Sequence, residues 1–150
     1  MLNKKNVEAS PERRKEMKKG LCIVLAMLLL TFGLTGCGKY ASHYSAVAHA
    51  YSNDTGSAWT SFYRFEGTEV FKLTIESGKT AKIQYSGELE TGSLTVYYDC
   101  GKAKTQLFTL HSGDEINACS EELAAGTVYV IIETSDPCTN GSLSFEVIYG

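Results

Sequence analysis

Apolar and polar residues alternate with a period of two along most of the chain after residue 59. The clearest runs cover residues 71–76, 81–86, 94–99 and 143–149. This period is typical of strands that bury one face and expose the other. Turn sequences rich in Gly, Ser, Asn and Asp separate the runs, and none of the runs has the length of a helix. The pattern therefore predicts seven or eight short strands and no long helix in this part.

Short strands at this spacing predict an all-β domain over residues 59–150. We expect a single antiparallel β-sandwich, with a jelly-roll-like arrangement as the first choice. Residues 128–132 are apolar at almost every position, which predicts a central strand. Residues 120–126 predict one helical turn or an arch, and Asp136-Pro137 predicts a loop. The order of the strands stays open, because one sequence does not determine it.

The N-terminal segment has a different pattern. Residues 1–19 are polar and mostly basic, and residues 21–34 are apolar apart from one Thr and one Gly. A basic segment followed by a short apolar run is typical of a secretory signal, whereas a spanning helix needs roughly 20 apolar residues. The alternative is a signal-anchor helix that is not cleaved. Either case predicts that the rest of the chain lies outside the cytoplasm.

The four residues Leu34-Thr35-Gly36-Cys37 directly follow the apolar run. They resemble the lipobox of bacterial lipoproteins. This resemblance implies that a diacylglycerol is attached to the Cys37 thiol, and that the signal peptide, residues 1–36, is removed. Two acyl chains anchor a protein stably, since each buried methylene contributes about 0.8 kcal/mol. The expected location is the outer face of the bacterial cell membrane, with the lipid bilayer as a partner through Cys37.

The segment between the lipid site and the strands is rich in Ser, Ala, Tyr and His. Residues 37–58 therefore predict a flexible tether, with a short strand or helix near residues 44–51 as the alternative. From Cys37 onward, 14 acidic residues face seven basic residues, which gives a formal net charge of −7. Nucleic acid and anionic membrane surfaces both favour positive charge. The charge therefore argues against either as a partner.

A second resemblance concerns the region from residue 65 to residue 149. Its motifs are glycines at turns and aromatic residues at core positions: Phe65-Glu66-Gly67, Phe71-x-Leu73, Gly78-Lys79, Tyr85-Ser86, Gly92-Ser93-Leu94, Gly126-Thr127-Val128-Tyr129 and Gly141-Ser142-Leu143-Ser144-Phe145. With these motifs the region resembles small cell-surface lipoproteins of Gram-positive bacteria that carry one β-sandwich and no known activity. The piece Ala125-Gly126-Thr127-x-Tyr129 is also similar to the last strands of bacterial pre-peptidase C-terminal domains, sandwiches related in shape to carbohydrate-binding modules. Both resemblances imply a fold and no site residue.

Three cysteines follow Cys37, and their spacing fits neither a zinc site nor a redox Cys-x-x-Cys motif. Cys100 ends one predicted strand, and the chain runs down and back before Cys119. Both should therefore lie at the same end of the sandwich, with Cys138 at the other end. We predict that Cys100 and Cys119 are close enough to form a disulfide, which requires Cα atoms within roughly 7 Å. The alternative is three partly buried thiols that behave as small apolar side chains.

No catalytic constellation is visible in the sequence. His43, His49 and His111 are too scattered for a metal cluster and are expected to be polar surface residues. The chain has no Gly-x-Ser-x-Gly nucleophile elbow, no His-Glu-x-x-His and no phosphate loop. Loop carboxylates between residues 114 and 122 offer oxygen ligands for calcium, but their spacing matches no known calcium loop. We therefore predict no catalytic residue, no metal and no cofactor.

Exposed aromatic residues are the best candidates for binding. Tyr97, Tyr129 and Trp59, with Tyr63 as a further member, are candidates for an exposed patch on which sugar rings stack. The favoured interpretation of these side chains is packing, in which the tether or the second sheet covers them. The sequence thus favours a non-catalytic binding or scaffold module at the cell envelope, with cell-wall glycan or another surface protein as its partner. The alternative function is an accessory or enzyme domain that acts on cell-wall or extracellular polysaccharide.

Overall fold

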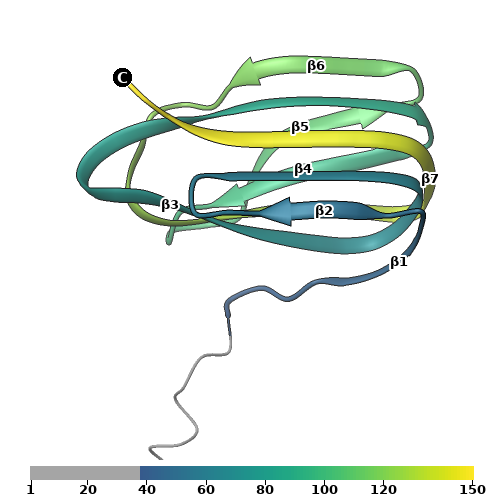
Figure 1. Cartoon of the computed structure of the whole chain (residues 1–150), viewed down its shortest axis with the longest axis horizontal. Coiled ribbons are helices and arrows are strands. Elements are labelled where there is room, and N and C mark those ends of the chain that lie inside the picture. The colour runs from purple at the N-terminus through teal and green to yellow at the C-terminus, as the bar shows by residue number, and fades with distance from the viewer. Residues whose placement is uncertain (1–37) are drawn as a thin grey trace, which may run out of the picture. The chain divides into compact units, whose positions relative to one another are not determined.

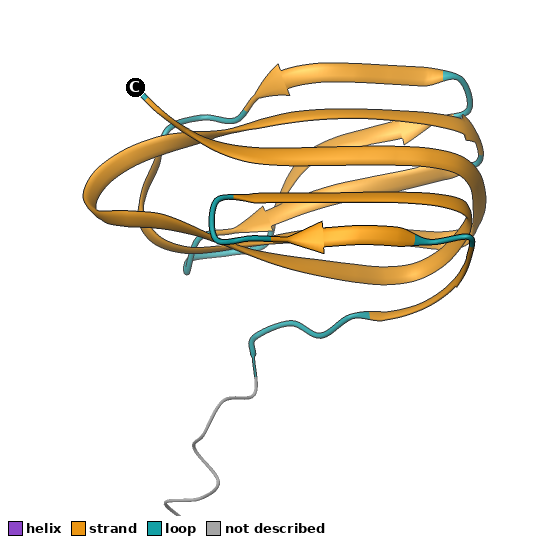
Figure 2. Ribbon diagram, viewed as in Figure 1, coloured by secondary structure: helices purple, strands orange, loops and turns teal. Residues whose placement is uncertain are grey.

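The computed structural model describes residues 38–150, and this part of the chain contains strands, turns and loops but no helix (Figure 2). The seven strands, in chain order, are β1 (His43–Val47), β2 (Ala50–Asn53), β3 (Ser57–Thr91), β4 (Ser93–Asp99), β5 (Thr105–His111), β6 (Asp114–Cys119) and β7 (Leu123–Tyr149). All pairs are antiparallel. The predicted all-β antiparallel sandwich is confirmed.

Two long strands, β3 and β7, bend so that the sheet curls into two layers (Figure 1). Layer A, nearest the viewer in Figure 1, has the spatial order β2, residues 57–62 of β3, residues 139–149 of β7, residues 81–91 of β3, and β6. Layer B has the order β1, residues 67–75 of β3, residues 126–134 of β7, β4, and β5. Each long strand therefore contributes to both layers.

The crossings between layers coincide with irregular pairing. The register of β3 against β7 shifts between Phe65 and Gly67, opposite the stretch of β7 that contains Pro137. Proline has no N–H to donate, so it is tolerated at such an irregularity. The loop predicted at Asp136-Pro137 is thus a bend within β7. Likewise, the helical turn predicted over residues 120–126 is wrong, because β7 begins at Leu123.

The chain also passes from layer A to layer B between β3 and β4, at Gly92, whose φ is +103°. Residues other than glycine rarely adopt this conformation. A Cβ at this position would also lie 2.8 Å from the Cβ of Cys138. Glycine is therefore required here for both its conformation and its size.

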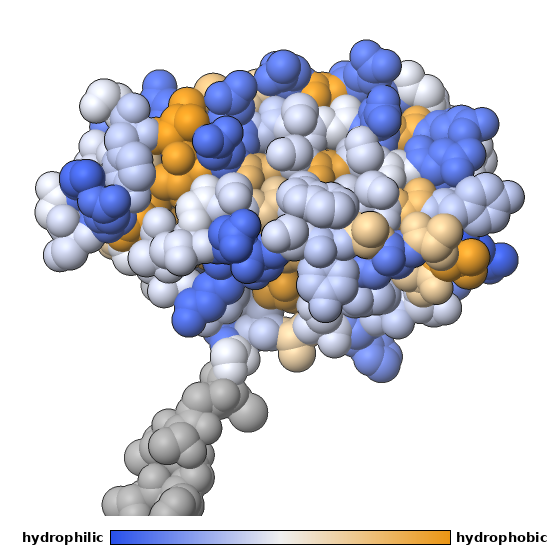
Figure 3. Space-filling model, viewed as in Figure 1, coloured by the Kyte–Doolittle hydropathy of each residue, from blue (hydrophilic) through white to orange (hydrophobic). Residues whose placement is uncertain are grey.

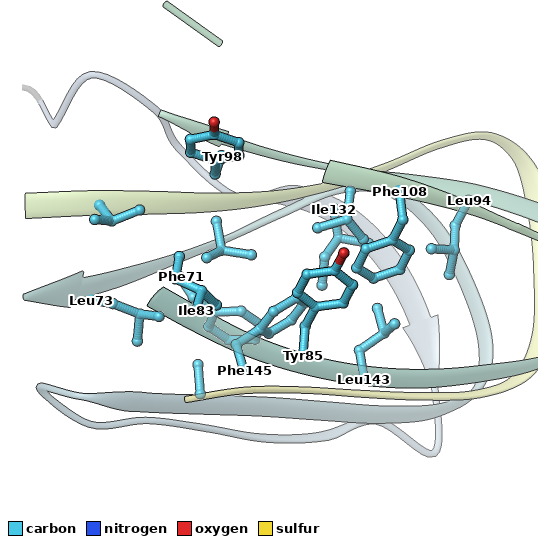
Figure 4. Packing of buried hydrophobic residues seen from close by; sticks show 14 of the residues in the cluster. Phe71, Leu73, Ile83, Tyr85, Leu94, Tyr98, Phe108, Ile132, Leu143 and Phe145 are labelled. Atoms are coloured by element: carbon cyan, nitrogen blue, oxygen red, sulfur yellow. The ribbon is translucent and has the colours of Figure 1, made fainter. Parts of the chain in front are cut away.

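The core lies between the two layers and uses the inward residue of each alternating pair (Figure 4). Phe71 of layer B and Phe145 of layer A are buried, with ring centroids 6.5 Å apart. Tyr85 of layer A stacks on Phe108 of layer B at 4.9 Å. Aromatic pairs at such separations add to the stabilisation from apolar burial. The layers are thus held together mainly by interdigitated apolar side chains.

Residues 38–58 contain two strands where a flexible tether was the first expectation, which agrees with the alternative of a short strand near residues 44–51. β1 pairs with residues 64–68 of β3, and β2 pairs with residues 58–61. The compact unit starts at Tyr40, whose hydroxyl donates a hydrogen bond to Asp99 Oδ2 at 2.7 Å. The expected domain boundary at residue 59 is therefore corrected to residue 40. The predicted signal peptide, residues 1–36, and Cys37 lie outside the described residues.

Candidate functional site

The outer face of layer A carries rows of small polar side chains that cross the strands. Side chains that alternate along a strand and pair across neighbouring strands share one face of a sheet. The first row, from β2 to β6, consists of Ser52, Trp59, Ser144, Ser86 and Asn117. The second row consists of Ala50, Ser61, Ser142, Glu88 and Glu115. The strands are spaced about 4.8 Å apart, so each row extends roughly 19 Å.

The members of these two rows on β3, β6 and β7 line an open groove with a volume of about 600 Å³. Four serines supply much of its floor: Ser61, Ser86, Ser142 and Ser144. Trp59 lines the groove and is 44% exposed. The groove face is turned to the viewer in Figure 3, where intermediate and hydrophilic colours dominate. The groove therefore combines one large aromatic ring with a hydroxyl-rich floor.

The charges around the groove are all negative. Glu88 and Glu115 line it and face each other across β3 and β6. Ser142 Oγ donates a hydrogen bond to Glu88 Oε1 at 3.2 Å. No Lys or Arg belongs to the lining. An anionic ligand would thus meet repulsion from the carboxylates with no compensating cation.

The three predicted stacking residues do not form one patch. Tyr97 and Tyr129 lie on layer B, whereas Trp59 lies on layer A. The ring of Tyr40 contacts Tyr129 edge-on at 5.4 Å. The Lys104 ammonium lies 4.2 Å from the ring centroid of Tyr97. The structure thus assigns packing contacts to both tyrosines and leaves Trp59 as the ring that faces the groove.

Cys100, Cys119 and Cys138 are all free thiols in this structure. Tyr98 donates a hydrogen bond to Glu121 at 2.5 Å, so the ends of β4 and β6 lie close together. This places Cys100 and Cys119 at one end of the sandwich, and the disulfide between them stays a prediction. Cys138 does not lie with these two cysteines; it lies beside Gly92 and is fully buried. Burial raises the pKa of its thiol to about 11.

The sequence did not predict a buried polar cluster formed by His49, Glu69 and Thr60. Glu69 is 2% exposed, and its Oε1 lies 3.0 Å from Nε2 of His49, whose side chain is 11% exposed. The same Nε2 lies 3.0 Å from Oγ1 of Thr60, and Oε2 of Glu69 has no hydrogen-bond partner. Desolvation raises the pKa of Glu69, and the hydrogen bonds and positive charge of its partners oppose that shift. The expectation that His49 is a surface residue is therefore wrong.

The sequence contained a signal for this cluster. Glu69 shares its parity on β3 with Phe71 and Leu73, which point into the core. An acidic residue at an inward position needs a partner, because burying an unpaired charge is costly. The partner itself was not predictable, since His49 reaches Glu69 only through the bend between β1 and β2.

Two negative findings apply to residues 38–150. None of these residues belongs to a helix long and apolar enough to cross a bilayer. In the same range, His, Cys, Asp and Glu side chains nowhere gather in groups of three or more that could hold a metal ion.

Comparison with known proteins gives only distant structural likenesses. No protein-family model matches the sequence, and the curated proteins give no match either. Among solved structures, a CBM4 structure has 15% sequence identity and a TM-score of 0.36, covering 67% of this chain and 76% of its own. A Drosophila melanogaster CENP-C cupin domain has 14% identity and a TM-score of 0.30, covering 95% of this chain and 99% of its own. Neither likeness carries an argument about function.

Proposed function

We propose that this protein is a lipid-anchored, non-catalytic binding module at the outer face of the bacterial cell membrane, and that the layer A groove binds a glycan of the cell envelope. The observation that carries the proposal is the groove itself: a half-exposed Trp59 above a floor of serine hydroxyls. Sugar rings offer apolar faces to an aromatic ring and hydroxyls to a polar floor. Serine can both donate and accept hydrogen bonds, which suits such a ligand.

Charge narrows the class of glycan. Glu88 and Glu115 line the groove without a neighbouring cation in the lining. Polymers that carry phosphate or carboxylate groups would be repelled, whereas an uncharged chain would not. The groove is also open, so an extended chain can lie along the rows of side chains. We therefore expect an uncharged, extended oligosaccharide to bind better than an anionic one.

The test uses the fact that Trp59 is the only tryptophan of the chain. Its fluorescence reports directly on the groove during titration with neutral β-glucan oligosaccharides, peptidoglycan fragments and teichoic acid. Trp59→Ala should weaken glycan binding roughly tenfold in calorimetry. Tyr63→Ala is the matched control, because Tyr63 is also an exposed aromatic residue of β3 but does not line the groove. Unchanged affinity in Trp59→Ala, or binding by none of the glycans, would contradict the proposal.

The anchor is tested separately. Cys37→Ala should abolish incorporation of labelled palmitate and release the protein from the membrane fraction. Cys119→Ala is the control, since Cys119 is an exposed thiol that should carry no lipid. Equal palmitate incorporation in Cys37→Ala and in the unmodified sequence would refute the anchor without affecting the groove.

One observation favours the alternative of an enzyme domain acting on polysaccharide. Glu88 and Glu115 are directly opposite each other in the groove, and glycoside hydrolysis uses a pair of carboxylates. Both side chains are exposed, however, whereas the general acid of such an enzyme typically lies in an apolar pocket. Release of reducing sugar ends that disappears in Glu88→Gln and Glu115→Gln would favour the enzyme over the binding module.

A further inference from the structure

The connection between β1 and β2 inserts a histidine into the sandwich. β1 pairs along one part of β3 and β2 along another, and the chain bends between them at Ala48 and His49. Ala48 has a φ of +47°, which is uncommon for a residue with a Cβ. This local strain persists only if surrounding contacts hold it. The contact available is the one that His49 makes with Glu69 and Thr60.

The carboxylate of Glu69 has a positively charged partner in this cluster only when His49 carries a second ring proton. His49 is the only ion-pair partner of Glu69 that the described part of the chain provides. The other titratable groups around it are two tyrosines: the ring of Tyr44 lies 5.0 Å from that of His49, and the ring of Tyr51 stacks on His49 at 5.2 Å. Burial and the charge of Glu69 raise the pKa of Tyr44, so this tyrosine stays neutral. The ionisable groups of the cluster are therefore the carboxyl of Glu69 and the imidazole of His49.

With one proton, the His49–Glu69 pair has no net charge, whether the proton is drawn on the imidazole or on the carboxyl. Without it, a buried carboxylate is left with a neutral imidazole and a hydroxyl. Its Oε2 already lacks a partner. An uncompensated charge in such a site is strongly unfavourable. Loss of the proton should therefore weaken the contact that holds the bend at Ala48.

The cluster is connected to the groove through β3. Thr60, which contacts His49 from the inner face, lies between Trp59 and Ser61, which face the groove. β2 pairs with this same stretch, with Tyr51 opposite Thr60 and Ser52 opposite Trp59. A change in the position of His49 thus acts on the edge strand and on the strand that carries the tryptophan.

We propose that His49, Glu69 and Thr60 form a proton-operated latch, which holds β2 and the Trp59 stretch in place when the pair is protonated and releases them when the proton is lost. The regulatory part of this inference rests on the proposed function, because it assumes that Trp59 contacts the ligand. The latch itself does not depend on the identity of the ligand. In the acidic state the groove has the form described above; in the alkaline state β2, which pairs with the Trp59 stretch, is mobile.

The experiment follows Trp59 emission and hydrogen exchange of β2 in the purified full-length chain without ligand, from about pH 5 to about pH 8. We expect a single sigmoidal change in emission, with faster exchange of β2 on the alkaline side after correction for intrinsic rates. Glu69→Gln should abolish the change, whereas His49→Gln should shift its midpoint, because the buried carboxyl of Glu69 can still take up a proton. His43→Gln and His111→Gln should retain it, because neither histidine contacts Glu69. Far-ultraviolet circular dichroism verifies that each variant is folded.

The outcomes separate the latch from the function. A pH transition of the same midpoint and size in Glu69→Gln, or no transition in the unmodified chain, would overturn the latch. Glycan affinity that is about fivefold tighter at the acidic end, a factor typical of coupled sites, would support regulation of the groove. An affinity that is independent of pH in the presence of the transition would overturn the regulation. A transition without binding of any glycan would leave the latch standing and refute the proposed function.

Discussion

At the scale of single residues, two buried groups show how this sandwich treats polarity in its interior. Cys138 is fully buried and its Sγ lies 3.4 Å from the carbonyl oxygen of Phe65. Glu69 is equally buried but has one oxygen without a partner. A thiol is only weakly polar, so it is compatible with the core. A carboxylate is not, and its protonation should therefore affect stability.

The stability of the protein should decrease as the pH rises. Burial raises the pKa of Glu69, so the folded state binds this proton more tightly than the unfolded chain does. The contribution is fully present below the ordinary pKa of a glutamate and is lost as the pH rises through the raised value. Glu69→Gln should remove this slope and increase the free energy of unfolding at about pH 8 by about 1–3 kcal/mol. Urea denaturation at several pH values measures it.

Glu76→Gln is the control for that measurement, since Glu76 is an exposed acid paired with Lys79 on the surface. It should keep the slope of the unmodified protein. An identical pH slope in Glu69→Gln and Glu76→Gln would show that Glu69 is not responsible.

Cys138 should be the least reactive of the three described thiols. Only the thiolate reacts with alkylating reagents. Burial raises the pKa of Cys138 from 9.0 to about 11, which lowers its thiolate fraction about 100-fold, and the buried site also restricts access. Alkylation of the native protein, followed by mass spectrometry, should modify Cys119 first and Cys138 last. Equal rates for Cys138 in native protein and in urea would contradict its burial.

At the scale of the elements, the fold depends on the places where the chain passes from one layer to the other. One of them is Gly92, which links β3 to β4 beside Cys138 of β7. Gly92→Ala should destabilise the protein by about 3 kcal/mol, because the new Cβ would meet Cys138 and the positive φ would become strained. Gly113→Ala is a matched control, since Gly113 also has a positive φ but open space around its Cβ position. Thermal unfolding compares the two. A larger loss in Gly113→Ala would show that the crowding at Cys138 is unimportant.

The ends of β4 and β6 permit a test of the predicted disulfide. The bond between Tyr98 and Glu121 holds these ends together, so mild oxidation should link Cys100 to Cys119 rather than either to Cys138. Peptide mapping under non-reducing conditions identifies the pair. A bridge that includes Cys138 would refute the prediction, because Cys138 lies beside Gly92.

The elements also show what the sequence could reveal. Alternation identified the strands over residues 81–86, 94–99 and 143–149, because each buries one face against the core. The same alternation marks the serines of the groove as outward residues. It did not reveal the groove, since that requires the register that places two parts of β3 on either side of β7, with β6 beside one of them. It gave β1 and β2 only as an alternative, a short strand or helix near residues 44–51, because their side chains are mostly exposed and carry no clear period.

At the scale of the whole molecule, the two layers share their two longest strands, so neither layer is complete without the other. We expect residues 40–150 to unfold in one cooperative step. Urea unfolding followed by Trp59 fluorescence, which reports on layer A, should coincide with unfolding followed by circular dichroism. Cys138 alkylation, which reports on the crossing between the layers, should follow the same curve. Separate midpoints would contradict a single cooperative unit.

The contact of Tyr40 with Asp99 and Tyr129 fixes the first residue of the folded unit onto layer B. Three residues of chain reach at most about 10 Å. A diacylglycerol at Cys37 would therefore hold Tyr40 within about that distance of the lipidated residue. Lipid headgroups would then lie close to the side that carries Tyr40. The groove, being on the opposite layer, would open away from the bilayer toward the wall polymers. A longer spacer would let an anchored protein sample both orientations, whereas a lipid at Cys37 would keep the groove facing outward.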